Sequence, residues 1–363
     1  MAGMVAISDL HLGAPASYLA VRSVRSRLFD TIRGLSDGYL DLLVLVGDVI
    51  DLTVGRAPEP WVIAREFFKE LADSVPMGGL VYVPGNHDHH VWVMLAEYQE
   101  LLRKIGELKR PPMGAVGHGG PQPVAGTAYP YWTPLHNLFE TSFQRKVVFA
   151  YPFHMELHGD TRFVFHHGHF FDPKISPLAS YAGARYKDWT RVEAFNLPYI
   201  ESLFSLCAWD SLVQDMELVF YSKLTRYGLT RPARCGRRVL EWVRKRRHRE
   251  SLGGCAIDRI DKMMEWGGFK SMQLRENDVW VFGHTHCKGA YAPSEAPKAM
   301  RWFNLGGWIL NYDPALGGNG AWSTPGIFYA DQDGNCDCQG ITLERREEES
   351  IRAKILRPGR TVR

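Results

Sequence analysis

The sequence predicts a layered α/β domain, and two patterns support this prediction. Over the first hundred residues, apolar runs of strand length alternate with segments of helical periodicity. In addition, five apolar runs along the chain each end in a short cluster of Asp, Asn or His side chains. Strands of parallel sheets are near-continuous apolar runs, and open α/β sheets bind ligands at the carboxyl ends of their strands. The five predicted strands are residues 5–7, 42–46, 80–83, 163–165 and 279–282.

Helices are predicted between the first strands, because apolar side chains recur at helical spacing over residues 21–32 and 61–71. A third helix is expected over residues 91–105, and the alternation favours βαβ units with right-handed crossovers. Residues 106–143 are rich in Pro and Gly and predict a long loop of the kind that often covers a site. Residues 155–165 predict a hairpin that turns at His158-Gly159-Asp160.

Helical periodicity returns over residues 174–270. Within this segment, residues 231–250 contain nine Lys or Arg and two Asp or Glu, a local net charge of +7. Strands are expected at residues 302–304 and 327–330, before a turn at 331–335 that leads to 340–343, and the charged chain beyond Glu344 is expected to fray. The predicted organisation is a main α/β domain of residues 1–172 and 275–343, a helical insertion of residues 173–274 and a charged tail of residues 344–363.

The composition is that of an ordinary globular protein. The 363-residue chain has a net charge of +3 and a hydrophobic content of 45%, enough for a substantial core. No signal peptide and no apolar run of about 18 residues is recognisable, so we expect a cytoplasmic protein without a transmembrane segment. The six cysteines are scattered and are interpreted as reduced thiols. Cys336-Asp337-Cys338 is an alternative site for a soft metal, although the other ligands of a thiolate site are missing.

The polar clusters at the predicted strand ends contain hard oxygen and imidazole donors, which divalent metals accept together. They are Asp9-Leu10-His11, Gly47-Asp48-Val49-Ile50-Asp51, Gly85-Asn86-His87-Asp88, His166-His167-Gly168-His169 and Gly283-His284-Thr285-His286. Because clusters at neighbouring strand ends can converge on one point, they predict a metal site, and their number favours two metals. The glycines before Asp48, Asn86 and His284 are expected to let the chain turn sharply. His284 and His286 are expected to point alike along an extended segment.

In this order, the five motifs resemble those of the calcineurin-like metallophosphoesterase superfamily. The resemblance runs from Asp9 to His286, although the segment between His169 and Asp278 holds no family motif. It implies a four-layer α/β/β/α sandwich of two mixed sheets, interrupted here by the helical insertion. It also implies a dinuclear-metal-dependent phosphohydrolase that cleaves a phosphoric ester or pyrophosphate by attack of a bridging hydroxide.

The same resemblance implies the ligands of two divalent ions. The first ion would be held by Asp9, His11 and His286, and the second by Asn86, His167 and His284, with Asp48 between them. Mn is the expected metal, and Fe, Zn and Co suit the same ligands.

His87 is predicted to be catalytic, because it lies one position past a ligand, where its side chain can reach a leaving-group oxygen. Asp51 follows the bridging Asp48 by three residues and is predicted to hold the other ring nitrogen of His87 and favour its protonated form. The superfamily pairs a histidine and an aspartate of these two motifs in this way.

The surplus histidines beside the motifs carry weaker predictions. His166 is expected to point away from His167 and to be structural. His169, His89 and His90 are candidates to line the pocket or to touch the substrate.

The substrate is less constrained by the sequence. Leu52 stands where the protein serine/threonine phosphatases of the superfamily have a phosphate-binding arginine, which argues against a phosphoprotein. The insertion lies where UDP-2,3-diacylglucosamine pyrophosphatases carry a helical lid, and Asp9-Leu10-His11-Leu12-Gly13 is similar to their motif. The chain departs from these enzymes at His87, where many have arginine, and in the greater length of its insertion.

Three interpretations of the basic insertion stay open. It can be a lid that contacts a lipid at the inner face of the membrane, the solvated face of a packed helical subdomain, or a nucleic-acid grip of the kind found in nucleases. Outside residues 231–250 the chain sums to −4 (+3 less +7), which argues against nucleic acid. The leading function is therefore hydrolysis of a lipid-linked or nucleotide-linked phosphate ester or pyrophosphate. A metal-dependent nuclease or phosphodiesterase and a non-catalytic scaffold are the alternatives.

Overall fold

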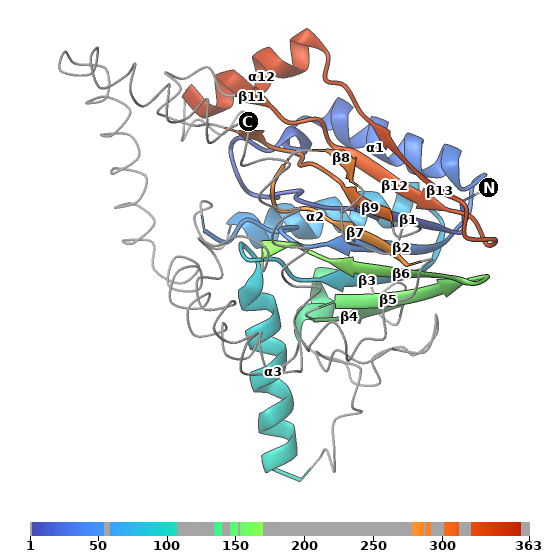
Figure 1. The fold of residues 1–363 in the computed structure, drawn as a ribbon. Coiled ribbons are helices and arrows are strands. Elements are labelled where there is room, and N and C mark those ends of the chain that lie inside the picture. Colours follow the sequence, from blue (N-terminus) through green and yellow to red (C-terminus); the bar gives the residue numbers. More distant parts are fainter. Residues whose placement is uncertain are drawn as a thin grey trace, which may run out of the picture.

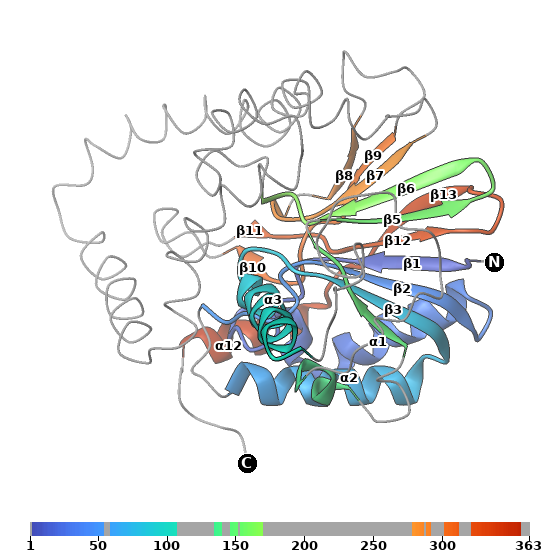
Figure 2. The same cartoon turned by 90° about the horizontal axis from the view of Figure 1, so that it is seen from below.

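The computed structural model describes residues 2–53, 59–106, 134–139, 146–151, 153–169, 278–286, 288–291, 301–311 and 321–356. The predicted helical insertion of residues 173–274, with its basic stretch, lies outside the described residues, as does most of the Pro- and Gly-rich segment. The described residues form two mixed β-sheets that lie against each other, with helices on the outer face of the first sheet (Figures 1 and 2). This arrangement confirms the predicted α/β sandwich of two mixed sheets.

The first sheet has the strand order β13-β12-β1-β2-β3-β4. Four neighbouring strands run parallel, as the βαβ prediction requires: β1 (Met4–Ile7), β2 (Leu40–Val46), β3 (Met77–Val83) and β4 (Val147–Phe149). On the other side of β1, two antiparallel strands complete the sheet: β12 (Gly326–Ala330) and β13 (Cys336–Gly340).

The second sheet has the order β5-β6-β7-β9-β8. The predicted hairpin is confirmed as the antiparallel pair β5 (Phe153–His158) and β6 (Thr161–His166). β7 (Val279–Phe282) and β9 (Arg301–Asn304) continue parallel to β6, and β8 (Gly289–Tyr291) pairs antiparallel at the edge. A separate two-stranded ribbon consists of β10 (Leu310–Asn311) and β11 (Ala321–Trp322).

The helices of the described residues are α1 (Arg22–Leu35), α2 (Glu59–Ser74), α3 (His89–Lys104), α12 (Arg345–Leu356) and the short 3-10 turns η1 (Tyr18–Ala20) and η2 (Pro134–Leu138). Figure 2 shows α1 and α2 side by side on the outer face of the first sheet. Most of the apolar side chains whose helical spacing predicted the two helices are buried, among them Leu28 and Phe67.

Two apolar cores follow from the alternation of side chains along the strands of the first sheet. Leu43 and Leu45 of β2 face the core that also contains Leu28 of α1 and Phe67 of α2. Val44 and Val46, the alternate residues, join the core that contains Phe165 and Val281 of the second sheet. The second core therefore holds the two sheets together, and it fixes the carboxyl ends of β1, β2, β3, β6 and β7 relative to one another.

The expectation that the chain frays beyond Glu344 is wrong for residues 345–356, which form α12. The side chain of Glu347 accepts a hydrogen bond from the backbone of Glu344 (2.8 Å), which caps the first turn of the helix. Glu347 also binds Ser23 and Arg27 of α1, and Ile351 is completely buried. These contacts outweigh the high charge of the segment. The last strand, β13, comprises Cys336–Gly340 and directly follows the predicted turn at residues 331–335.

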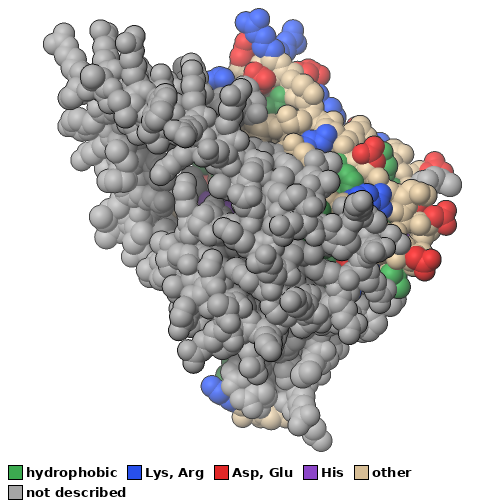
Figure 3. Space-filling view, viewed as in Figure 1, with side chains coloured by type: hydrophobic (Ala, Val, Ile, Leu, Met, Phe, Trp, Pro, Cys, Tyr) green, Lys and Arg blue, Asp and Glu red, His purple; other side chains and the backbone are tan. Residues whose placement is uncertain are grey.

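Two surface properties complete the description. No helix in the described part of the chain is long and apolar enough to cross a membrane. On the face drawn in Figure 3, the acidic and basic side chains of the described surface are interspersed, most visibly over α12, whose sequence contains both kinds.

Candidate metal centre

The seven predicted ligands come from loops that follow five strands, and the structure brings them together at one edge of the sandwich. Asp9 and His11 follow β1, Asp48 follows β2, Asn86 follows β3, His167 follows β6, and His284 and His286 follow β7. The parallel pairing of β1 with β2 and β3, and of β6 with β7, aligns these carboxyl ends within each sheet. The core between the sheets then places the two sets of loops opposite each other.

The first group of donors consists of Asp9, His11 and His286, whose ligand atoms lie within 4.8 Å of one another. The Nε2 atoms of His11 and His286 are 3.1 Å apart, and Nε2 of His286 is 3.3 Å from Oδ1 of Asp9. Asp9 and His11 are buried, while the side chain of His286 is 19% exposed. The group is therefore built on buried side chains and open on one side.

The second group consists of Asp48, His167 and His284, again with their ligand atoms within 4.8 Å of one another. Asn86 joins this group, because its Oδ1 atom lies 3.0 Å from Nδ1 of His284 and 3.2 Å from Nε2 of His167. Asp48 lies between the two groups: its Oδ2 atom is 3.2 Å from Nε2 of His167 and 3.8 Å from Nε2 of His11.

This donor set fits divalent metal ions. Carboxylate, amide oxygen and imidazole donors of this kind bind Mn, Fe, Zn and Co. The ring nitrogens that do not face the cluster are held from behind: Nδ1 of His11 lies 2.9 Å from Oδ2 of Asp51, and Nδ1 of His167 lies 3.0 Å from the carbonyl oxygen of Val46. Such contacts fix the tautomer and direct the Nε2 lone pair toward a metal, as in established metal sites.

The backbone at the ligands is in an uncommon conformation. Among the described residues, six non-glycine residues have a left-handed φ, and five of them are predicted ligands: Asp9 (54°), His11 (47°), Asp48 (50°), His284 (67°) and His286 (57°). Such residues cost about 1–3 kcal/mol each and concentrate at functional sites. The expectation of an extended Gly-His-Thr-His segment is therefore wrong. The two imidazoles converge because the backbone coils at both positions.

Two of the glycines, Gly85 and Gly283, allow neighbouring loops to approach closely and do not form a sharp turn. A Cβ atom at Gly283 would lie 2.0 Å from Oδ2 of Asp9, and a Cβ atom at Gly85 would lie 2.3 Å from Oδ1 of Asp48. Neither glycine has a left-handed φ, whereas Gly47 does (79°). The prediction of a sharp turn thus holds at Gly47, and the other two glycines let the ligand loops pack against each other.

His87 lies beside the centre and is tied to Asp51, as the sequence suggested. Its Nδ1 atom is 3.3 Å from Oδ1 of Asp51 and 2.8 Å from Oγ1 of Thr53. Because the Thr53 hydroxyl donates its one proton to Oδ1 of Asp51 (2.8 Å), it accepts a hydrogen bond from Nδ1–H of His87. Thr53 therefore fixes the proton on Nδ1. The His87 side chain is 26% exposed, so it can meet a substrate.

Asp88 ends the Gly-Asn-His-Asp motif, and the sequence predicted no role for it. The structure shows that it joins two loops. As the residue before α3 it occupies a helix-capping position, yet its carboxylate accepts hydrogen bonds from the backbone N–H of Val49 (2.8 Å) and Gly85 (2.6 Å). It also accepts one from the hydroxyl of Tyr82 (2.6 Å). Asp88 thus fastens the β2 loop to the β3 loop. The available signal was an acidic residue at the end of a predicted ligand motif, whereas nothing in the sequence pointed to Thr53.

The charges of the cluster shift the pKa values of its members. Burial alone would raise the pKa of the Asp48 and Asp51 carboxyls, but the imidazoles nearby, led by His167 for Asp48 and by His87 for Asp51, hold both well below their usual range. Burial likewise opposes the imidazolium forms, yet Asp51 and Asp48 raise the pKa of His87 to about 10, and Asp48 contributes most to raising that of His167 to about 9. The Asp48 and Asp51 carboxylates are thus ionised at neutral pH, and a metal bound by His167 would have to displace the proton from its ring.

The surplus histidines are all buried. His166 accepts a hydrogen bond at Nδ1 from the backbone of Gly168 (2.9 Å), in keeping with a structural role. His89 and His169 are completely buried and contact Tyr151. A direct contact of these two with a substrate stays a prediction, as it does for His90.

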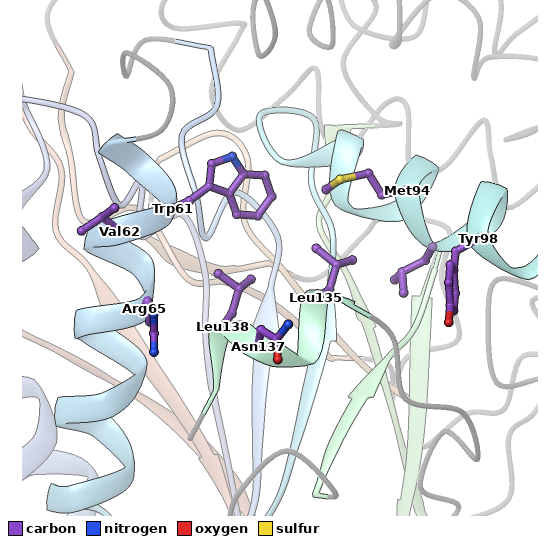
Figure 4. A pocket seen from close by; sticks show the side chains of 9 residues that line it. Trp61, Val62, Arg65, Met94, Tyr98, Leu135, Asn137 and Leu138 are labelled. Atoms are coloured by element: carbon purple, nitrogen blue, oxygen red, sulfur yellow. The ribbon is translucent and has the colours of Figure 1, made fainter. Parts of the chain in front are cut away.

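Two other features lie apart from the donor cluster. A largely apolar cavity of about 470 Å³ separates α2, α3 and η2, and Figure 4 shows that Trp61, Met94 and Leu135 line it. None of the predicted ligands is among its lining residues.

Cys336 and Cys338 lie on β13 as free thiols, and burial raises the pKa of each to about 11. Thiols in this state are poor ligands, so the structure gives no support to a soft-metal site there.

The fold and the donor cluster together define a metal-binding protein of the layered α/β type. The sequence matches the family model of the calcineurin-like phosphoesterases over residues 4–288, a span that covers most of the chain and all five motifs. The chain therefore belongs to the calcineurin-like phosphoesterase family and is a phosphoester hydrolase. No curated protein matches the sequence significantly.

Proposed function

We propose that this chain is a dinuclear-metal-dependent phosphohydrolase whose two ions are held by Asp9, His11, His286, Asp48, Asn86, His167 and His284. The position of Asp48 carries the proposal. Its Oδ2 atom lies 3.2 Å from a nitrogen of one donor group and 3.8 Å from a nitrogen of the other, so one carboxylate can serve both ions. A shared ligand of this kind is what a two-metal site requires.

When bound, two such ions supply a water of lowered pKa and stabilise negative charge on phosphoryl oxygens. The residues of this chain provide the geometry for that chemistry. His87 and His284 are partly exposed, while Asp9, Asp48 and His167 beneath them are buried, so a phosphoryl group would approach from the exposed side.

We assign to His87 the protonation of the leaving-group oxygen. A ring nitrogen of His87 lies within 4.8 Å of ligand atoms of His11 and Asp48, which places the ring next to the centre. Asp51 and Thr53 hold its Nδ1–H, so rotation of the ring is restricted. A general acid of this kind typically contributes about 10²–10⁴-fold to the rate.

For the substrate we propose a lipid-linked or nucleotide-linked phosphate ester or pyrophosphate, and for the metal Mn. The substrate proposal rests on the position and charge of the insertion in the sequence, and the insertion lies outside the described residues. A metal-dependent nuclease is the second candidate, because the chemistry proposed for this centre also applies to the phosphodiester bonds of nucleic acids. We place the protein in the cytoplasm, with peripheral membrane contact through the insertion.

The test is hydrolysis after removal of metals by chelation and addition of Mn²⁺. The substrates are an aryl phosphodiester, an aryl phosphomonoester, UDP-diacylglucosamine and single-stranded DNA. Asp48→Asn is compared with Asp41→Asn, which changes an exposed aspartate at the opposite end of β2. His87→Ala is compared with His158→Ala, a change on the β5–β6 hairpin.

Activity that returns with Mn²⁺, disappears in Asp48→Asn and persists in Asp41→Asn supports the proposal. Preference for the acylated nucleotide supports the lipid-linked substrate, and preference for DNA supports the nuclease. Full activity in the chelated protein, or equal activity in Asp48→Asn and the wild type, would contradict the metal mechanism.

A further inference from the structure

Tyr151 lies where the chain crosses from the first sheet to the second. The residue before it, Ala150, still pairs with the first sheet through a backbone hydrogen bond to Tyr82 (2.9 Å). Two residues after it, Phe153 begins β5 of the second sheet. The side chain of Tyr151 is 4% exposed, so it is buried at the junction of the two sheets.

The hydroxyl of Tyr151 lies between two histidines that extend from ligand loops. It is 3.1 Å from Nε2 of His89, which is three residues past Asn86 and begins α3. It is 3.5 Å from Nε2 of His169, which is two residues past His167. A tyrosine hydroxyl can donate one hydrogen bond and accept another, so it can pair with both imidazoles at once.

The ring of Tyr151 is held as firmly as its hydroxyl. Trp92 of α3 stacks against it, with ring centroids 5.1 Å apart and an angle of 21° between the planes. The ring of His169 is nearly parallel to it at 6.3 Å and 12°. His169 in turn packs against His167, at 5.6 Å between centroids. A continuous set of contacts therefore joins α3 to the ligand His167.

We propose that Tyr151 is a positioning residue for the half of the metal centre that contains Asn86 and His167. These two ligands belong to different sheets, so their separation depends on contacts between the sheets. The hydroxyl of Tyr151 joins the two loops directly beyond the ligands. Asp9 and His11 are fastened differently, by Ser8 and Asp51. Loss of the hydroxyl should therefore lower the affinity for the ion of this half and leave the affinity for the other ion unchanged. This inference rests on the proposed dinuclear centre.

The test is Mn²⁺ binding to the metal-free full-length chain, measured by titration and by electron paramagnetic resonance. The wild type should bind two ions that give a spin-coupled signal. Tyr151→Phe keeps the ring packing and removes the hydroxyl. It should lower the affinity for the second ion alone, by about 10- to 100-fold, as for other contacts behind metal ligands. At limiting Mn²⁺ the variant should give the signal of an isolated ion.

Three further variants separate positioning from a loss of fold. Tyr18→Phe removes another buried tyrosine hydroxyl, one that donates to the carbonyl oxygen of Ser323 (3.1 Å), and it should leave both ions unchanged. His89→Gln retains a hydrogen-bonding group toward Tyr151. It should therefore bind the second ion more tightly than His89→Leu does. Thermal melting of each variant confirms that the domain is folded.

The outcomes are distinct. If the wild type binds two ions and Tyr151→Phe binds both with unchanged affinity, the positioning role is wrong while the metal centre stands. If Tyr151→Phe lowers the affinity for both ions equally, Tyr151 supports the whole centre and its assignment to one half is wrong. If the wild type binds no pair of ions, the proposed centre itself fails.

Discussion

The carboxylate of Asp51 lies 2.9 Å from Nδ1 of His11, through its Oδ2 atom. The other oxygen lies 3.3 Å from Nδ1 of His87. One buried side chain thus orients both a proposed metal ligand and the proposed acid. Asp51 therefore contacts one more histidine than the sequence predicted, because only the contact with His87 was expected.

We predict that Asp51→Asn lowers both metal affinity and turnover, because an amide cannot accept hydrogen bonds from both imidazoles as a carboxylate does. Contacts of this kind typically account for about 10- to 100-fold in metal affinity or activity. Metal content after dialysis and kcat of the Mn²⁺-loaded protein are the measurements. Unchanged values of both would show that Asp51 has no orienting role.

Thr53→Val should lower kcat and leave metal content unchanged, since Thr53 contacts His87 and Asp51 and no proposed ligand through its hydroxyl in the described structure. Loss of a hydrogen bond of about 1 kcal/mol corresponds to roughly a fivefold decrease in rate. Thr53→Ser retains the hydroxyl and is the matched control. A fall in metal content in Thr53→Val, with kcat per bound metal pair preserved, would assign Thr53 to the metal site instead.

Gly283→Ala should displace Asp9, because the added Cβ would lie 2.0 Å from both Oδ2 of Asp9 and Oγ of Ser8. We expect a loss of about 1–3 kcal/mol in the free energy of unfolding, as for overpacked cores, together with reduced metal content. Gly34→Ala in α1 is the control, since nothing lies within 4 Å of its Cβ position. That change should raise stability by about 0.5–1 kcal/mol. Equal urea midpoints for the two variants would refute the close-approach argument.

The docking of α12 should weaken in acid. Burial alone would raise the pKa of Glu347, but hydrogen bonds from Ser23, the backbone of Glu344 and Arg27 hold it below its usual value of 4.5. A carboxyl with a lowered folded pKa contributes stability that is full above the unfolded pKa and lost as the pH falls through the folded one. The difference in urea midpoint between the wild type and Glu347→Gln should therefore be largest at pH 7 and shrink toward pH 3. A constant difference across that range would exclude the ionised carboxylate as its cause.

The thiols of Cys336 and Cys338 should react slowly with iodoacetamide. Because burial raises their pKa to about 11, their thiolate fraction at pH 8.5 is roughly 100-fold lower than that of an ordinary cysteine. Peptide mapping by mass spectrometry, with and without urea, measures this. Rapid labelling of the folded protein at these two positions would mean that the thiols are activated and would reopen the soft-metal alternative.

The sequence predicted the sheet strands that precede the proposed ligands because each is a continuous apolar run that ends in polar residues. Val44 and Phe165, for example, lie in the core between the sheets as such runs require. The convergence of Asp48 with His167 followed from the rule that sites form at strand ends. Periodicity also sufficed for α1 and α2, whose apolar faces are wide.

Other features depend on contacts that no local pattern encodes. The left-handed backbone at His284 accompanies a hydrogen bond from its backbone N–H to Asp9 (3.0 Å), which is distant in sequence. The helix at residues 345–356 is held against α1 by Ser23 and Arg27, which are distant in sequence. The position of Tyr151 between two ligand loops likewise arises only when the two sheets meet.

The central claim is that one carboxylate, that of Asp48, lies between two metal ions. A crystal structure of the Mn²⁺-loaded protein, with an anomalous difference map recorded near the manganese edge, tests it most directly. The account predicts two peaks on either side of Asp48, one among Asp9, His11 and His286 and the other among Asn86, His167 and His284. A single peak, or two peaks that do not share Asp48, would contradict it.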